Sequence, residues 1–302
     1  MSAAERMPEA PQVREGGVGG APAAVGVLGG GRMGAGIAHA FLLAGSRVTV
    51  VERDADAAEA AGRRVRDAVA VSIERGTADE TAGAYDARFA TSTEVGDFAA
   101  CELVVEAVPE ELALKADALT RVEAVLSPDA ALATNTSSIS IDELAALLDR
   151  PHRFLGMHFF NPVPASALVE LVRGHSTDAT LAVEAQSWVQ AIGKTPIVVA
   201  DAPGFASSRL GVALGLEAIR MLEAGVASAE DIDRAMTLGY KHPVGPLRLT
   251  DLVGLDVRLG IAEYLASTLG ERFEPPALLR RMVAEGRLGR KSGEGFYLWD
   301  AP

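Results

Sequence analysis

The stretch Val25-Gly26-Val27-Leu28-Gly29-Gly30-Gly31-Arg32-Met33-Gly34 decides the fold of this chain. Residues 23–28 have the apolar pattern of a short buried strand, and a helical pattern follows the glycines. This order is typical of a dinucleotide site. Gly29 permits a tight turn, Gly31 lets the backbone approach a pyrophosphate, and Gly34 packs helix against strand. We therefore expect the helix to point its N-terminus at phosphates.

A second strand pattern, Arg47 to Val51, ends at Glu52, at about the spacing expected of a carboxylate that binds the adenosine ribose. Such a carboxylate would repel a 2′-phosphate, so the sequence predicts NAD as cofactor in preference to NADP. The neighbouring Arg53 argues the other way. A protein that only senses redox state by binding NAD would keep the same residues.

Composition limits the partners that this chain can have. It has 302 residues, 49% of them hydrophobic, and a formal net charge of −13, which argues against nucleic acid and anionic membranes as partners. Its one cysteine, Cys101, fits a reducing cytoplasm. No signal-peptide pattern and no run of ~18 apolar residues occurs, so we expect a soluble, unexported protein. No metal site is expected.

A polar loop is predicted after another strand of the same sheet. Residues 103–108 form an apolar strand pattern that only Glu106 interrupts, and a further strand, residues 130–134, runs into Asn135-Thr136-Ser137-Ser138. A capping box at Ser140 then opens a helix with three leucines, residues 144, 147 and 148, expected inward. The loop should lie at the carboxyl edge of the sheet, where open α/β sheets bind ligands. Simple turn chemistry would also explain it.

His158 ends a strand pattern and is followed at once by a turn that contains proline. Twelve residues on, Glu170 interrupts an apolar run, where an unpartnered carboxylate is costly. A histidine held by a carboxylate is a common general base, so we predict that the two pair. A core histidine and a strand-end glutamate are the alternative.

The alternation of strands and helices ends near Pro203. We therefore predict a flexible lead-in (residues 1–21), an α/β, Rossmann-type, doubly wound and mainly parallel domain (22–202), and a smaller helical domain (203–302) that contributes to the substrate site or to a homodimer. Helices are expected at residues 207–223, 228–236, 257–269 and 277–285.

Several long motifs in the same order make the chain resemble the L-3-hydroxyacyl-CoA dehydrogenase family, from about Val25 to Trp299, in its stand-alone bacterial form. The motifs are residues 29–34, 105–110, 135–138, 158–162, 203–205, 242–246, 251–256 and 289–297. The resemblance implies reversible, NAD-dependent oxidation of (S)-3-hydroxyacyl-CoA to 3-oxoacyl-CoA, with a short acyl chain.

The resemblance also assigns roles to residues. His158 matches the catalytic base, Glu170 the acid that orients it, and Ser137 a hydroxyl that contacts the substrate 3-oxygen. Cofactor contacts are implied at Gly29, Gly31, Arg32, Met33, Gly34, Glu52, Ala107, Glu110, Lys115, Asn135, Asn161 and Lys291. The acyl-CoA would also meet Arg75, on a helix that carries Arg63, Arg64 and Arg66, although such a run is often only a solvated face.

One position departs from the family. Ser208 stands where an asparagine usually precedes Arg209, and this leaves the positioning and the identity of the substrate open. Dehydrogenases of free 3-hydroxy acids or sugar acids on the same fold are the nearest alternative. An NAD-binding redox sensor is a remote one, because it has no need for His158 and Glu170 together.

Overall fold

The sheet of the computed structural model, which describes residues 20–300, has eight strands in the order β3-β2-β1-β4-β5-β6-β7-β8. The neighbours are parallel except β6 and β7, which run antiparallel. The strands are β1 (Ala24–Leu28), β2 (Arg47–Val51), β3 (Phe89–Ser92), β4 (Leu103–Glu106), β5 (Ala131–Thr134), β6 (Phe154–Phe159), β7 (Leu168–Arg173) and β8 (Thr195–Ala200). The predicted mainly parallel, doubly wound sheet is confirmed.

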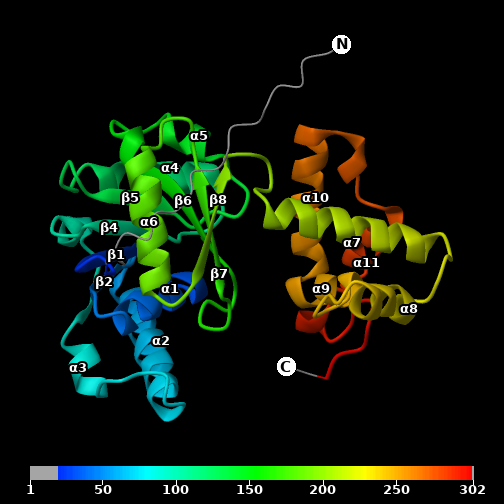
Figure 1. Ribbon diagram of the computed structural model, residues 1–302, viewed down its shortest axis with the longest axis horizontal. Helices are drawn as coiled ribbons and strands as arrows, with labels where there is room; N and C mark the ends of the chain where they lie inside the picture. The colour runs from blue at the N-terminus through cyan, green and yellow to red at the C-terminus, as the bar shows by residue number, and fades with distance from the viewer. Residues whose placement is uncertain (1–19, 301–302) are drawn as a thin grey trace.

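Helices cover both faces of this sheet, as Figure 1 shows. One apolar core joins the sheet to α1 (Arg32–Leu43), α2 (Ala55–Glu74), α3 (Ala82–Asp86) and α6 (Ala179–Ala191). A second core, on the opposite face, involves α4 (Leu112–Glu123), α5 (Ile141–Ala145) and the 3-10 turn Val95–Phe98. Because β4 and β5 are buried on both faces, their sequences are apolar except for Glu106 and Thr134 at their ends.

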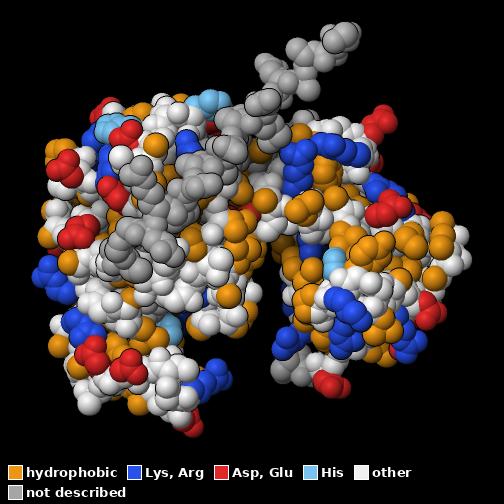
Figure 2. Space-filling model, in the orientation of Figure 1, with side chains coloured by type: hydrophobic (Ala, Val, Ile, Leu, Met, Phe, Trp, Pro, Cys, Tyr) orange, Lys and Arg blue, Asp and Glu red, His pale blue; other side chains and the backbone are white. Residues whose placement is uncertain are grey.

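The chain after β8 is helical and forms its own core. Its helices are α7 (Ser207–Glu223), α8 (Ala229–Arg234), α9 (Pro246–Val253), α10 (Leu255–Leu269) and α11 (Ala277–Ala284). We call this part the helical half. In Figure 1 it stands beside the sheet, joined through the segment from β8 to α7. The space-filling view in Figure 2 shows a deep groove between the two parts.

Local details differ from the expectations of the sequence in three places. The helix after Ser140 ends at Ala145, so Leu147 is 51% exposed, although Leu144 and Leu148 are buried as predicted. The helix expected at 228–236 ends at Arg234 and continues as a π-helical turn, Ala235–Gly239. The strand β3 and the helices α3, α6 and α9 were not anticipated; of these, β3, α3 and α9 are too short for a clear periodicity.

The described residues bear on three further expectations. Within 20–300, no helix is long and apolar enough to cross a membrane, and no cluster of three metal-ligating side chains occurs. Burial raises the pKa of the Cys101 thiol to about 11, so this cysteine is protonated and unreactive at neutral pH. Most of the lead-in, residues 1–19, lies outside the described part of the chain.

Candidate active site

The glycine loop has the shape that its sequence predicted. Gly29 has φ +92°, a conformation that side chains with a Cβ disfavour. A Cβ at Gly34 would lie 1.7 Å from the carbonyl oxygen of Gly29, so only glycine lets the helix pack this closely. At Gly31, which precedes α1, a Cβ would meet nothing within 4 Å, and no side chain caps the helix. The first N–H groups of α1 are therefore open to an anion.

Glu52 lies at the end of β2 and reaches this loop. Its Oε1 accepts a hydrogen bond from the backbone N–H of Gly30 at 2.7 Å. Arg53, the residue that argued for NADP, points to solvent and pairs with Asp54 at 2.9 Å. The carboxylate beside the loop is thus fixed, whereas the neighbouring guanidinium is bound to an acid of its own.

Three more residues with predicted cofactor contacts lie around the glycine loop. Arg32 is exposed at the start of α1, and Met33 is half-buried behind it. The carbonyl oxygen of Ala107, after β4, lies 3.0 Å from the place a Cβ of Gly29 would occupy, so Ala107 backs the turn.

A buried ion pair that was not predicted supports the end of β4. Lys115 of α4 places its Nζ 2.8 Å and 3.0 Å from the two carboxylate oxygens of Glu106, and both side chains are almost fully buried. The same Nζ donates to the carbonyl of Val108 at 3.2 Å, and Thr134 donates to Glu106 at 2.5 Å. Lys115 therefore neutralises Glu106 and fixes the backbone that follows β4. Its predicted contact with a cofactor stays a prediction.

Glu110 organises the polar loop that follows β5. Its Oε1 accepts hydrogen bonds from the hydroxyl of Thr136 at 2.6 Å and from the backbone N–H groups of Ser137 at 2.8 Å and Ser138 at 3.1 Å. Burial alone would raise the pKa of Glu110, but Lys115 and these donors outweigh it and lower that pKa. The loop is held in one conformation by a carboxylate that stays ionised.

Asn135 links the same loop to β6. Its side-chain oxygen accepts the backbone N–H of Phe159 at 2.9 Å. Asn135 and Ser137 are both half-buried, and they are adjacent to the strand that carries His158. The predicted meeting of the loop and His158 at one edge of the sheet is thus what the structure shows.

His158 and Glu170 lie directly opposite each other on the antiparallel strands β6 and β7. Nδ1 of His158 is 2.8 Å from Oε2 of Glu170, and both residues are buried. Because an ionised carboxylate only accepts hydrogen bonds, Nδ1 carries the hydrogen and Nε2 is left with a free lone pair. The predicted pair is present, in the tautomer that a general base requires.

The sequence did not point to Ser207, which completes this pair. Its hydroxyl donates to Oε2 of Glu170 at 2.5 Å, and the backbone N–H groups of Ala206 and Ser207 donate to Oε1 at 3.2 Å and 2.9 Å. Burial would raise the pKa of Glu170, but the bonds from His158 and Ser207 prevail and lower it. The only available signal was a serine at the start of a helix, which is common.

Aromatic rings enclose the imidazole. The ring centroids of Phe160 and Phe205 lie 4.5 Å and 5.8 Å from that of His158. Phe205 has φ 49°, an uncommon conformation for a bulky residue, and it directly precedes the residues that hold Glu170. This strained turn brings the ring and the two backbone N–H groups to the base.

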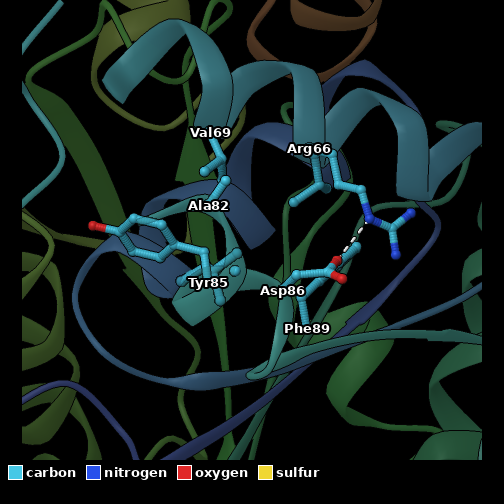
Figure 3. Close-up of a pocket in the computed structure, with 9 residues that line it drawn as sticks. Arg66, Val69, Ala82, Tyr85, Asp86 and Phe89 are labelled. Atoms are coloured by element: carbon cyan, nitrogen blue, oxygen red, sulfur yellow. Dashed lines mark hydrogen bonds and ion pairs between the residues drawn. The ribbon is translucent and has the colours of Figure 1, made fainter. Parts of the chain in front are cut away.

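The arginines of α2 do not act as one cluster. Arg66 lines a cavity of about 290 Å³ beside α2, α3 and β3, pairs with Asp86 at 2.7 Å and lies over the ring of Phe89. Figure 3 shows the Arg66–Asp86 pair among the residues that line this cavity. Arg63 pairs with Glu59, and Arg64 donates to the carbonyl of Gly30 at 3.3 Å. Arg75, at the end of α2, is exposed.

Three further predicted positions lie apart from the imidazole pair. Asn161 is exposed directly after β6, and Ser208 is half-buried on α7 next to Ser207. Lys291 belongs to the helical half, where its Nζ lies 2.6 Å from the carboxylate of Asp256. Within residues 20–300, no hydrogen bond joins these three side chains to His158 or Glu170.

The chain was compared with known proteins. The family described as 3-hydroxyacyl-CoA dehydrogenase matches twice, with its NAD binding domain over residues 24–202 and its C-terminal domain over residues 204–299. A 3-hydroxybutyryl-CoA dehydrogenase of Mycobacterium tuberculosis is 44% identical over 280 residues, 91% of this chain and 98% of the relative. A probable 3-hydroxybutyryl-CoA dehydrogenase of Deinococcus radiodurans is 41% identical over 273 residues, 90% and 98% of the two chains.

A solved structure agrees with these matches. The (S)-3-hydroxybutyryl-CoA dehydrogenase of Ralstonia eutropha superimposes with a TM-score of 0.88 at 39% identity, and the alignment covers 93% of this chain and all of the other.

Proposed function

The chain belongs to the 3-hydroxyacyl-CoA dehydrogenase family, and from this premise we propose that it oxidises short-chain (S)-3-hydroxyacyl-CoA esters reversibly to 3-oxoacyl-CoA esters with NAD. The names of its relatives support a four-carbon acyl group. The observation that carries the proposal is the pair His158–Glu170, which lies on the sheet edge that also bears the glycine loop.

The residues present fit NAD. The open N-terminus of α1 at Gly31 would take the pyrophosphate, and Glu52, fixed by Gly30, would accept hydrogen bonds from the adenosine ribose. Bound there, NAD supplies the acceptor for the hydride that leaves carbon 3. Contacts from Arg32, Met33, Ala107, Glu110, Lys115, Asn135, Asn161 and Lys291 are part of the proposal.

His158 would take the proton of the 3-hydroxyl at Nε2. The imidazolium that results is stabilised by Glu170, whose other donors, Ser207 and the backbone of Ala206, keep the carboxylate ionised and in place. The surrounding Phe160 and Phe205 exclude water from the ring. General base catalysis of this kind typically contributes about 10²- to 10⁴-fold in rate.

Ser137 would hold the 3-oxygen of the substrate. Its loop is fixed by Glu110 through several hydrogen bonds, so its hydroxyl is positioned before the substrate binds. Ser208 would approach the carbonyl group of the substrate. Arg75 would contact the phosphates of CoA. The exposed position of Arg75 leaves it free for this contact.

The test is steady-state kinetics with acetoacetyl-CoA, longer 3-oxoacyl-CoA esters and a free 3-hydroxy acid. The proposal expects kcat/KM to be highest for a short CoA ester and to be at least a hundredfold lower for the free acid. The opposite order would favour a dehydrogenase of free acids. Binding of NAD without turnover of any substrate would favour a sensor.

We also propose a cytoplasmic homodimer. The single, buried Cys101 supports a reducing compartment, and exposed apolar side chains on the helical half, Leu210, Leu238 and Tyr240, support a second copy there. Light scattering on the purified protein tests the dimer.

A further inference from the structure

Arg258, on α10, is a buried guanidinium whose charge no described residue neutralises. Only 7% of the residue is exposed, and within residues 20–300 its Nε has no hydrogen-bond partner. Burial is the sole influence on its pKa, which falls to about 10, whereas a nearby carboxylate would raise it. Since buried arginines are normally paired, this one is placed to receive an acceptor from outside the described fold.

The acidic residues nearest to Arg258 in the sequence are occupied elsewhere. Asp256 binds Lys291, Glu263 binds Arg280, and Asp251 accepts the backbone N–H groups of Phe296 and Tyr297 and the indole N–H of Trp299. Each of these carboxylates thus has a partner other than Arg258. Within residues 20–300, Oδ1 of Asp256 has no hydrogen-bond partner, but no carboxylate contributes to the pKa of Arg258, which burial alone lowers.

Space for this guanidinium is made by a glycine. Gly211 lies inside α7, where glycine destabilises a helix. A Cβ at Gly211 would lie 3.1 Å from Nη1 and 3.6 Å from Nη2 of Arg258. The guanidinium therefore occupies the place of a side chain on α7, and we call Gly211 and Arg258 together the arginine niche.

The arginine niche shares a helix face with the support of the catalytic pair. Gly211 follows Ser207 by four residues and Ser208 by three, so all three lie on one side of α7, with Gly211 ~6 Å along the axis from Ser207. Ser207 contacts Glu170. The guanidinium thus lies roughly one helical turn beyond the point where α7 meets the pair.

We propose that Arg258 recognises a carboxylate at the far end of an acyl chain, so that among 3-hydroxyacyl-CoA esters of equal chain length the one with a terminal carboxylate is preferred. This rests on the proposed function, because carbon 3 at His158 sets where the acyl chain begins. Guanidinium and carboxylate form paired hydrogen bonds, whereas a methyl end would leave the buried charge without a partner.

The test compares two esters of equal length, 3-hydroxyadipyl-CoA and 3-hydroxyhexanoyl-CoA, which differ by a terminal carboxylate. The wild-type enzyme should show kcat/KM at least about tenfold higher for the adipyl ester. Arg258→Met should abolish this ratio and Arg258→Lys should keep part of it. Arg234→Met is the matched control, because Arg234 is exposed and pairs with Glu230 on α8; its ratio should equal that of the wild type.

Separate outcomes decide the inference and the function beneath it. Equal kcat/KM for the two esters in the wild type, or a preference that survives Arg258→Met, would overturn the role of Arg258 while leaving the dehydrogenase intact. So would a change of oligomeric state in Arg258→Met with the preference unchanged, since the acceptor would then come from a second copy.

Two measurements cover the remaining cases. Gly211→Ala, which crowds the guanidinium, should reduce the preference even if Arg258→Met does not fold. If neither ester is turned over, the proposed function fails, and the dissociation constants of adipyl-CoA and hexanoyl-CoA, measured by calorimetry, still test recognition: equal constants would refute it.

Discussion

Replacing Glu170 by glutamine tests the centre of the mechanism, because this carboxylate accepts four hydrogen bonds. Its donors are the imidazole of His158 at 2.8 Å, the hydroxyl of Ser207 at 2.5 Å, and the backbone N–H groups of Ala206 and Ser207 at 3.2 Å and 2.9 Å. A glutamine offers one accepting oxygen and one NH₂ group that can only donate.

The backbone donors cannot reverse their direction, so the glutamine oxygen should take the place of Oε1. The NH₂ group would then face Nδ1 of His158 and donate to it. The imidazole hydrogen would have to move to Nε2, which is the atom that takes the substrate proton. The variant should therefore hold the ring in place but in the wrong tautomer.

We expect Glu170→Gln to lower kcat by about 10²- to 10⁴-fold at neutral pH, the full range of general base catalysis, which corresponds to roughly 3 to 5.5 kcal/mol in the barrier. The KM for NAD should stay within about twofold. Removal of the base itself, by His158→Gln, should cost at least as much.

The assay is single-turnover oxidation of 3-hydroxybutyryl-CoA, with the ester deuterated at carbon 3 to show that hydride transfer limits the rate. Glu184→Gln, an exposed glutamate of α6 that pairs with Arg153, controls for a charge change alone. If Glu170→Gln kept kcat within threefold of wild type while the isotope effect persisted, the tautomer argument would be wrong.

Four other predictions follow from the same geometry. NAD should exceed NADP in kcat/KM, and Glu52→Gln should narrow that ratio; a wild-type ratio of one or less would contradict the role of Glu52. Arg75→Glu should raise the KM for the CoA ester but not for NAD, and no change in either would make Arg75 part of a solvated face. Ser208→Ala should lower kcat/KM by less than about tenfold and Ser208→Asn should raise activity on short esters; loss of all activity in the latter would mean that the serine itself is an adapted contact. The pKa of Glu110 is lower in the folded protein, so its stabilisation is present above the ordinary glutamate value of ~4.3 and is lost as the pH falls below it; thermal unfolding from pH 7 to pH 3 should show a smaller acid loss in Glu110→Gln than in wild type.

The parts of the fold that local patterns specify could be predicted. The glycine loop needs positive φ at Gly29 and close packing at Gly34, and both needs are visible in the residue type. The second strand and Glu52 follow from apolar run length and spacing. The pairing of His158 with Glu170 could be expected because each would otherwise be a polar group buried in an apolar strand.

Contacts between distant segments could not be predicted. Glu106 was visible as a charge in an apolar strand, but nothing in the sequence indicated that Lys115 of the next helix would be buried with it. Ser207 and Arg258 have ordinary neighbours in the chain. Their roles depend on how α7 packs against β7 and α10, and that packing is set by tertiary contacts among cores that one sequence does not reveal.

The donors to Glu170 come from both parts of the molecule, so the support of the general base depends on contact between the sheet and the helical half. The imidazole belongs to the sheet, whereas Ala206 and Ser207 belong to the start of α7. A sheet region separated from its helical half would retain the glycine loop and Glu52 and could still take up NAD, yet its glutamate would lose three of its four hydrogen bonds. Apart from Lys291, the proposed cofactor contacts all lie in the sheet region, whereas the proposed proton transfer depends on donors from both parts. Exchange of the helical half between relatives would therefore replace part of the support of the base as well as one wall of the groove.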